Sequence, residues 1–170
     1  MALTDLSDWS FLEHLAPIAT AVIAFGAASV AVFSLLTQIH IARRRAAIDV
    51  FLKTEMDQAM LTAFHDYMDG LEAARQYTDI DQFKTADPKS YRAVRTYLNV
   101  NELICIGINH KAFDQRVCYG FWSDVLNTAR TEGAKIIDDA RAPIDCAHTY
   151  DHILSVNERW QKPGREKWRR

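Results

Sequence analysis

Residues 15–36 read LAPIATAVIAFGAASVAVFSLL, and this stretch decides the architecture of the chain. No Asp, Glu, Lys or Arg occurs between Glu13 and Arg43. An α-helix rises about 1.5 Å per residue, so this stretch would cover roughly 33 Å, close to the thickness of a bilayer core. A soluble protein of this size rarely buries a helix that is apolar on every side. The stretch therefore predicts a transmembrane helix over residues 15–39.

The charges on either side predict the orientation of this helix. A cleaved signal peptide begins with a positive region and has a shorter apolar stretch, whereas no Lys or Arg precedes Arg43. By the positive-inside rule, arginines that follow the helix stay in the cytoplasm. We therefore expect a single-pass protein of the cell inner membrane, with its N-terminus outside and its C-terminal domain in the cytoplasm. The flanking charges are Asp5, Asp8 and Glu13 before the stretch and Arg43, Arg44 and Arg45 after it.

The average composition conceals this uneven distribution. The chain has 170 residues, of which 49% are hydrophobic and 25% charged, and its net charge is −2. These values exclude a disordered chain and a histone-like basic protein. The net charge combines −3 over residues 1–14, none over residues 15–42, +3 at residues 43–45, −7 over residues 46–158 and +5 over residues 159–170. The three cysteines have no CxxC spacing, which indicates neither a disulfide framework nor a zinc site.

The remaining sequence predicts helices throughout, so the fold class is all-α. An apolar stripe from Ile48 to Leu71 repeats at three- and four-residue steps, which indicates that the first helix continues from residue 15 to residue 76. Residues 78–87 are polar and are expected to form a connection. The further helices are expected over 88–109, from the cap Asp114 to 132, over 134–141, and from Asp145 to 160.

These elements divide the chain into four parts. We expect a short extracytoplasmic N-terminus (1–14), the transmembrane helix (15–39), a cytoplasmic helical bundle (40–160) and a basic mobile tail (161–170).

The densest polar pattern lies in the helix predicted over residues 88–109. Arg95, Asn99 and Glu102 are four and three residues apart and share one helix face, with Tyr91 one turn earlier. This face would be a ligand or acid/base site, or a structural network that fixes how helices pack; the structural interpretation is favoured. Three later residues are candidates to complete the group: Asp114, Arg141 and Tyr150.

At this point the sequence resembles a bacterial and phage family of unknown function, the domain of unknown function family numbered 4760. The resemblance rests on the neck RRAAID (44–49) and on the pattern YxxxRxYLNxxE (91–102). It extends over residues 40–160 and continues as Gly107, Ile108, Asp114, Arg141, Tyr150, Leu154 and Trp160. The family implies one N-terminal spanning helix and no established activity, and its setting implies a role in phage exclusion or defence.

No cofactor or metal is indicated by the remaining motifs. His148 and His152 have a spacing that can chelate a metal, but no third ligand is evident in the sequence. No GxGxxG, Walker A, GxSxG or EF-hand pattern occurs. Catalytic residues are therefore not assigned.

Two features indicate contacts in or at the membrane. Small residues at helical spacing in the spanning helix would let two copies approach closely, which predicts a possible homo-oligomer. Basic residues mixed with Trp suit an anionic lipid surface. The helix-association stripe is Ala24, Ala27, Ala28 and Ala31; the membrane-surface residues are Arg43, Arg44, Arg45, Arg165, Lys167, Trp168, Arg169 and Arg170.

Three functions follow, in order of preference. The first is a membrane-anchored helical module that binds an unknown protein partner or a second copy and is not an enzyme. The second is a small-ligand sensor or enzyme that uses the Arg95/Asn99/Glu102 face. The third and least favoured is nucleic-acid contact through the basic tail, with Trp stacking on bases.

Overall fold

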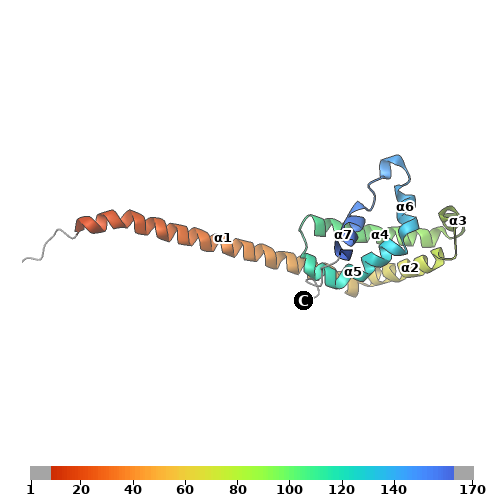
Figure 1. Ribbon diagram of the computed structural model, residues 1–170. Helices are drawn as coiled ribbons and strands as arrows, with labels where there is room; N and C mark the ends of the chain where they lie inside the picture. The colour runs from red at the N-terminus through yellow and green to blue at the C-terminus, as the bar shows by residue number, and fades with distance from the viewer. Residues whose placement is uncertain (1–8, 163–170) are drawn as a thin grey trace, which may run out of the picture. The chain divides into compact units, whose positions relative to one another are not determined.

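The computed structural model describes residues 9–162, which form helices joined by short connections (Figure 1). It divides into two compact units at Ala42 and Arg43, which are described separately below. No strand occurs in the described residues. Residues 102–108 (ELICIGI) are helical, as the helix predicted over 88–109 requires. The all-α fold class is therefore confirmed.

The first unit is the N-terminal part of α1 (Trp9–Met56). Every side chain from residue 15 to residue 42 is exposed, among them Phe25 (76%) and Phe33 (73%). The hydroxyl groups of Thr20 and Ser29 donate to the carbonyl oxygens one turn earlier, both at 2.8 Å. Polar groups satisfied within the helix in this way suit an environment without water.

The start of α1 differs from the prediction. The helix begins at Trp9 rather than near residue 15, so Pro17 lies inside it and not in its first turn. The stretch from Leu15 to Met56 is the one segment of the described residues that is long and apolar enough to cross a membrane.

The second unit is built around α4 (Pro88–Asn109), which packs against all the other long helices of the bundle. Its buried face carries Val94, Leu98 and Ile108. The helices that pack against it are α2 (Gln58–Ala74), α3 (Ile80–Ala86), α5 (Gln115–Thr131), α6 (Ala134–Arg141) and α7 (Asp151–Gln161).

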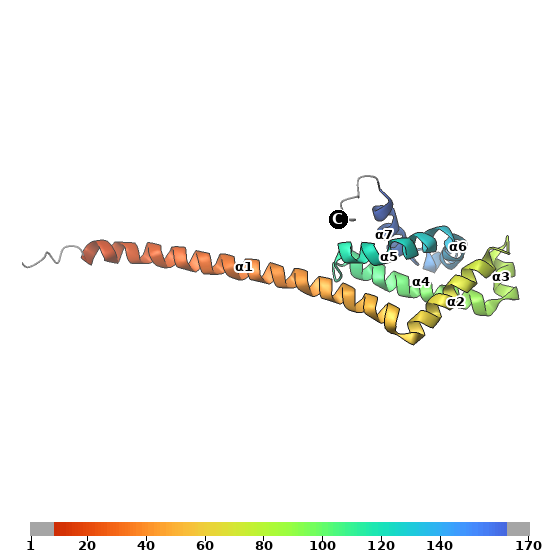
Figure 2. The ribbon, with the colours of Figure 1, turned by 90° about the horizontal axis from the view of Figure 1, so that it is seen from below.

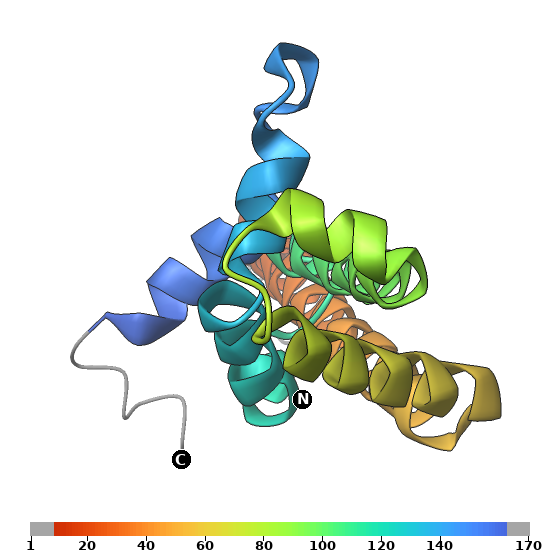
Figure 3. The same ribbon diagram turned by 90° about the vertical axis from the view of Figure 1, so that its right-hand side faces the viewer.

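The C-terminal end of α1 belongs to this unit and packs against α5. The ring of Phe51 stacks on Phe121 with 3.6 Å between centroids, and the Asp114 amide donates to the Arg43 carbonyl oxygen at 3.2 Å. The chain then turns sharply into α2 (Figure 2). α6 and the short 3₁₀ helix after it (Ile144–Cys146) project from the bundle, as Figures 1 and 3 show.

The prediction of one helix from 15 to 76 is wrong, because the chain breaks at Asp57. This residue has an extended backbone, and its carboxylate accepts hydrogen bonds from the amides of Ala59 (2.8 Å) and Met60 (3.2 Å). A carboxylate in this position caps a new helix. The apolar stripe is divided accordingly: Tyr67 and Leu71 are buried, whereas the α1 side chains of the stripe are more exposed.

Two other boundaries also differ from the predictions. Residues 78–87 contain the helix α3, which the carboxylate of Asp79 caps and whose Phe83 is fully buried. The last helix begins at Asp151 rather than at Asp145. The reason lies outside the local sequence and is described below.

Candidate functional site

The predicted polar face of α4 carries a chain of hydrogen bonds that reaches α7. The Arg95 guanidinium donates from Nε to the Tyr150 hydroxyl and from Nη1 to the Tyr91 hydroxyl, both at 3.2 Å. Tyr150 in turn donates to Oδ1 of Asn99 at 3.0 Å. Burial raises the pKa of both phenols, so they stay neutral and can donate and accept at the same time. Four of the predicted residues therefore meet.

Two residues that the sequence analysis did not select extend this chain to α3 and α6. The Tyr91 hydroxyl donates to Oδ2 of Asp139 at 2.6 Å, and the ammonium of Lys84 donates to the other oxygen of the same carboxylate. Burial alone would raise the pKa of Asp139, but the hydrogen bonds from Lys84 and Tyr91 outweigh it and hold the pKa below its ordinary value. We call Lys84, Asp139, Tyr91, Arg95, Tyr150 and Asn99 the polar network.

Glu102 lies on the same face of α4 as Arg95 but bonds to backbone amides and not to the polar network. Its two carboxylate oxygens accept hydrogen bonds from the backbone amides of His152 (3.2 Å) and Ile153 (2.9 Å) in the first turn of α7. Tyr150, which precedes this helix, has a left-handed backbone (φ 64°) and provides no side-chain cap. Glu102 on α4 therefore caps α7, and this long-range contact explains why the helix begins at Asp151.

The other two candidates lie outside the polar network. Nη1 of Arg141 donates to the Thr149 carbonyl oxygen (2.9 Å) and pairs with Asp151 (2.5 Å), which ties the end of α6 to the start of α7. Asp114 caps α5 by accepting hydrogen bonds from the amides of Arg116 and Val117, both at 3.0 Å.

The two histidines and the buried Cys118 form neither a metal site nor a reactive thiol among the residues that the structure describes. No group of three His, Cys, Asp or Glu residues there has an arrangement that would hold a metal. His148 contacts Asp151 and His152 contacts Asn109, so the two histidines have separate partners. Cys118 is buried, and this burial raises the pKa of its thiol to about 12, which keeps it protonated and unreactive.

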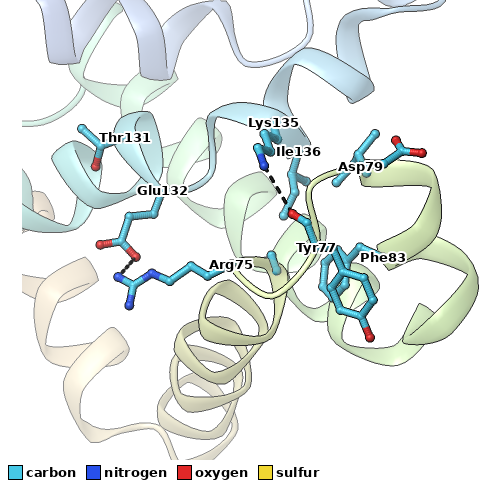
Figure 4. Close-up of a pocket in the computed structure, with 10 residues that line it drawn as sticks. Arg75, Tyr77, Asp79, Phe83, Thr131, Glu132, Lys135 and Ile136 are labelled. Atoms are coloured by element: carbon cyan, nitrogen blue, oxygen red, sulfur yellow. Dashed lines mark hydrogen bonds and ion pairs between the residues drawn. The ribbon is translucent and has the colours of Figure 1, made fainter.

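A cavity of about 250 Å³ is lined by none of the predicted residues, although the ring of Phe83, which lines it, lies 6.1 Å from that of Tyr91 between centroids (Figure 4). It opens between the end of α2, the loop into α3, and the junction of α5 with α6. Phe83 and Ile136 form its buried part. Its lining residues are Ala74, Arg75, Tyr77, Asp79, Ile80, Phe83, Thr131, Glu132, Lys135 and Ile136.

The charged groups at the rim of this cavity differ in their pairing. Arg75 pairs with Glu132 at 2.6 Å and with Glu72 at 2.5 Å. Nζ of Lys135 instead donates to the carbonyl oxygens of Tyr77 and Thr78, both at 3.3 Å, and Figure 4 shows the bond to Tyr77. No motif marks these residues in the sequence, because they come from two stretches, 74–83 and 131–136, that only the folded chain brings together.

The predicted membrane-contact residues are placed only in part. Arg44 and Arg45 are exposed, and Arg43 is half-buried. The four alanines of the helix-association stripe are exposed on α1. The predicted contact residues of the tail lie outside the described residues; they are Arg165, Lys167, Trp168, Arg169 and Arg170.

Comparison with known proteins identifies one relationship. A family model described as Domain of unknown function (DUF4760) matches residues 21–160. No curated protein and no solved structure matches the chain.

Proposed function

The chain belongs to the DUF4760 family, and we propose that it is a single-pass inner-membrane protein whose helical cytoplasmic domain binds a partner protein or a second copy. The observation that carries this proposal is α1. All side chains of residues 15–42 are exposed, and none of them is Asp, Glu, Lys or Arg. Exposed apolar surface of this size is unfavourable in water and favourable in lipid.

The charges support the proposed orientation. Arg43, Arg44 and Arg45 follow the apolar stretch directly, and such clusters stay on the cytoplasmic side. They would also attract anionic headgroups of the inner leaflet, by about 1 kcal/mol for each cation near the surface. The basic tail would add to this attraction in the same way.

A binding role for the helical domain is supported by its surface and by its polar network. Ile48, Leu52 and Met56, each four residues apart on α1, are exposed by 40%, 44% and 76%. The polar groups on the Arg95/Asn99/Glu102 face bond mainly to one another and to α7, which favours a structural role over catalysis. The enzyme hypothesis therefore ranks below the binding module.

The proposal is tested by extraction and by reporter fusion of the full chain. We expect the protein to stay in the membrane fraction after alkaline carbonate treatment, at its full mass. A C-terminal fusion to a reporter that works only in the cytoplasm should be active, and the matched fusion to alkaline phosphatase inactive. Release of a shortened protein would instead indicate a signal sequence, and the reverse reporter pattern would overturn the orientation.

Two expectations from the sequence stay predictions. One is phage exclusion or defence, which the resemblance to the family implies. The other is nucleic-acid contact through the tail.

A further inference from the structure

We propose that the cavity between α2, α3, α5 and α6 binds a small organic carboxylate, with its apolar body inside the cavity and its carboxylate against Lys135. This inference goes beyond the membrane-module proposal. It also uses none of the residues that the sequence analysis selected.

The inner part of the cavity suits an apolar group. Phe83 is fully buried and Ile136 is 1% exposed, and both line the cavity together with Ala74 and Ile80. Figure 4 shows Tyr77 and Phe83 close together on one side, and their ring centroids are 5.4 Å apart. Phe83 and Ile136 are closed to water, so a ligand ring or short alkyl chain would replace water next to the half-buried Ala74, Tyr77 and Ile80, and this replacement is the main source of affinity in such sites.

The volume limits the size of the ligand. Ligand pockets usually measure about 300–1,000 Å³, so a cavity of about 250 Å³ lies just below that range. One liquid water takes about 30 Å³, which makes the cavity equivalent to roughly eight waters. A single ring with a short side chain fits this space, whereas a dinucleotide cofactor does not.

The rim favours a negative group. The carboxylate of Glu132 is paired with Arg75, and that of Asp79 accepts the amide of Asp81 at 3.1 Å. Lys135, by contrast, has no carboxylate within 4.0 Å among the described residues, and its contacts are two carbonyl oxygens. An ammonium that lacks a counter-charge gains a charge-assisted hydrogen bond when a carboxylate approaches. A ligand ammonium in the same place would be repelled.

The test uses three probes with the same apolar body: 3-phenylpropionate, 3-phenylpropanol and 3-phenylpropylamine. Binding to the full chain in lipid nanodiscs is measured by saturation-transfer NMR, with empty nanodiscs subtracted. We expect the carboxylate to bind most tightly and the amine least. Lys135→Gln should weaken binding of the carboxylate probe by about threefold to fivefold, because one exposed ion pair contributes a free energy of about that size. The substitution should leave the affinity for the alcohol unchanged.

A cavity-filling substitution and two matched controls separate the cavity from the general surface. Ala74→Leu fills the cavity and should abolish binding of all three probes, whereas Ala59→Leu, at an exposed site on the same helix, should not. Lys89→Gln removes an exposed cation elsewhere and should leave every affinity unchanged. Equal binding of the three probes, or carboxylate binding that survives Ala74→Leu, would overturn the proposal, as would no binding at all. Because the membrane proposal is tested by topology, either one can fail alone.

Discussion

Glu102 shows how one side chain can decide where a distant helix begins. The first amides of a helix usually donate to the side chain of the residue directly before it. The first amides of α7 instead donate to the carboxylate of Glu102 on α4. The contact joins residues about fifty positions apart in the chain. The local sequence therefore predicts Asp145 as the cap, six residues before the observed start of α7.

Replacing Glu102 with Ala should lower the free energy of unfolding by about 1–2 kcal/mol, because two amides of α7 lose their acceptor. Glu102→Gln keeps one side-chain oxygen and should recover part of the loss. Thermal unfolding of the full chain measures both, with the exposed carboxylate variant Asp66→Ala as control. Equal melting temperatures for Glu102→Ala and the control would contradict the capping role.

Asp139 makes the stability of the polar network depend on pH. Its pKa in the folded chain is held below the ordinary value of 3.8, so its contribution to stability is fully present above that value. The contribution is lost as the pH falls through the lowered pKa, because protonation breaks the pair with Lys84. Acid should therefore weaken the contacts of Asp139 that hold α3, α4 and α6 together.

Asp139→Asn should lower stability at neutral pH by about 1–3 kcal/mol and should flatten the loss of stability below pH 4. The adjacent Asp138 is exposed, which makes Asp138→Asn a matched control. Melting temperatures of the three proteins between pH 7 and pH 3 provide the measurement. A wild-type curve parallel to that of Asp139→Asn would exclude the ion pair as a source of the pH dependence.

Packing of α2 against α4 depends on the absence of a side chain at Gly70. A Cβ atom there would lie 2.7 Å from Cγ2 of Val94 and 2.9 Å from the carbonyl oxygen of Ser90. The second of these atoms belongs to the backbone and can move only together with α4. At Gly120 on α5, by contrast, a Cβ atom would have no neighbour within 4 Å.

Two glycine substitutions should therefore change the stability of the domain in opposite directions. Gly70→Ala should destabilise the domain by about 1–3 kcal/mol, because the helices must separate. Gly120→Ala should stabilise it by about 0.5–1 kcal/mol, because alanine loses less backbone entropy in a helix. Chemical unfolding of both variants tests the pair, and a stabilising effect of Gly70→Ala would show that the two helices do not approach as closely as described.

At the element level, the helices with local signals were predicted well. The pair Asp87-Pro88 marks the start of α4, and Asp114 marks the start of α5. In the structure each of the two carboxylates accepts a hydrogen bond from a backbone amide in the first turn of its own helix. α3 was missed because a seven-residue helix between polar neighbours has no clear apolar period. The break at Asp57 was missed because the apolar stripe continues through it.

For the candidate site, sequence spacing located part of the network. Arg95 and Asn99 are one turn apart on α4, and Tyr91 and Tyr150 hydrogen-bond to them. Lys84 and Asp139 belong to no motif. Lys84 lies seven residues before Tyr91, but the chain breaks between them at Asp87, and Asp139 is 48 residues from Tyr91. The cavity has no signal in the sequence for the same reason.

For the whole molecule, self-association through α1 stays a prediction that one substitution can test. Ala28→Leu enlarges the centre of the small-residue stripe and should lower the dimer fraction about threefold, which corresponds to a typical interhelical contact in lipid. Ala19→Leu adds the same volume off the stripe and should leave the dimer fraction unchanged. Cross-linking in native membranes provides the measurement, and equal loss in both variants would remove the stripe as the interface.

The sequence by itself determined the class of this protein: an apolar, uncharged helix followed by an all-α domain with a basic collar. These features depend on composition and on the helical period, which are local properties of the chain. Only the tertiary structure decided the cap of α7, the ion pair between Lys84 and Asp139, and the cavity beside Lys135. Each of these joins residues whose separation in sequence has no period, and packing around α4 is what brings them within contact distance.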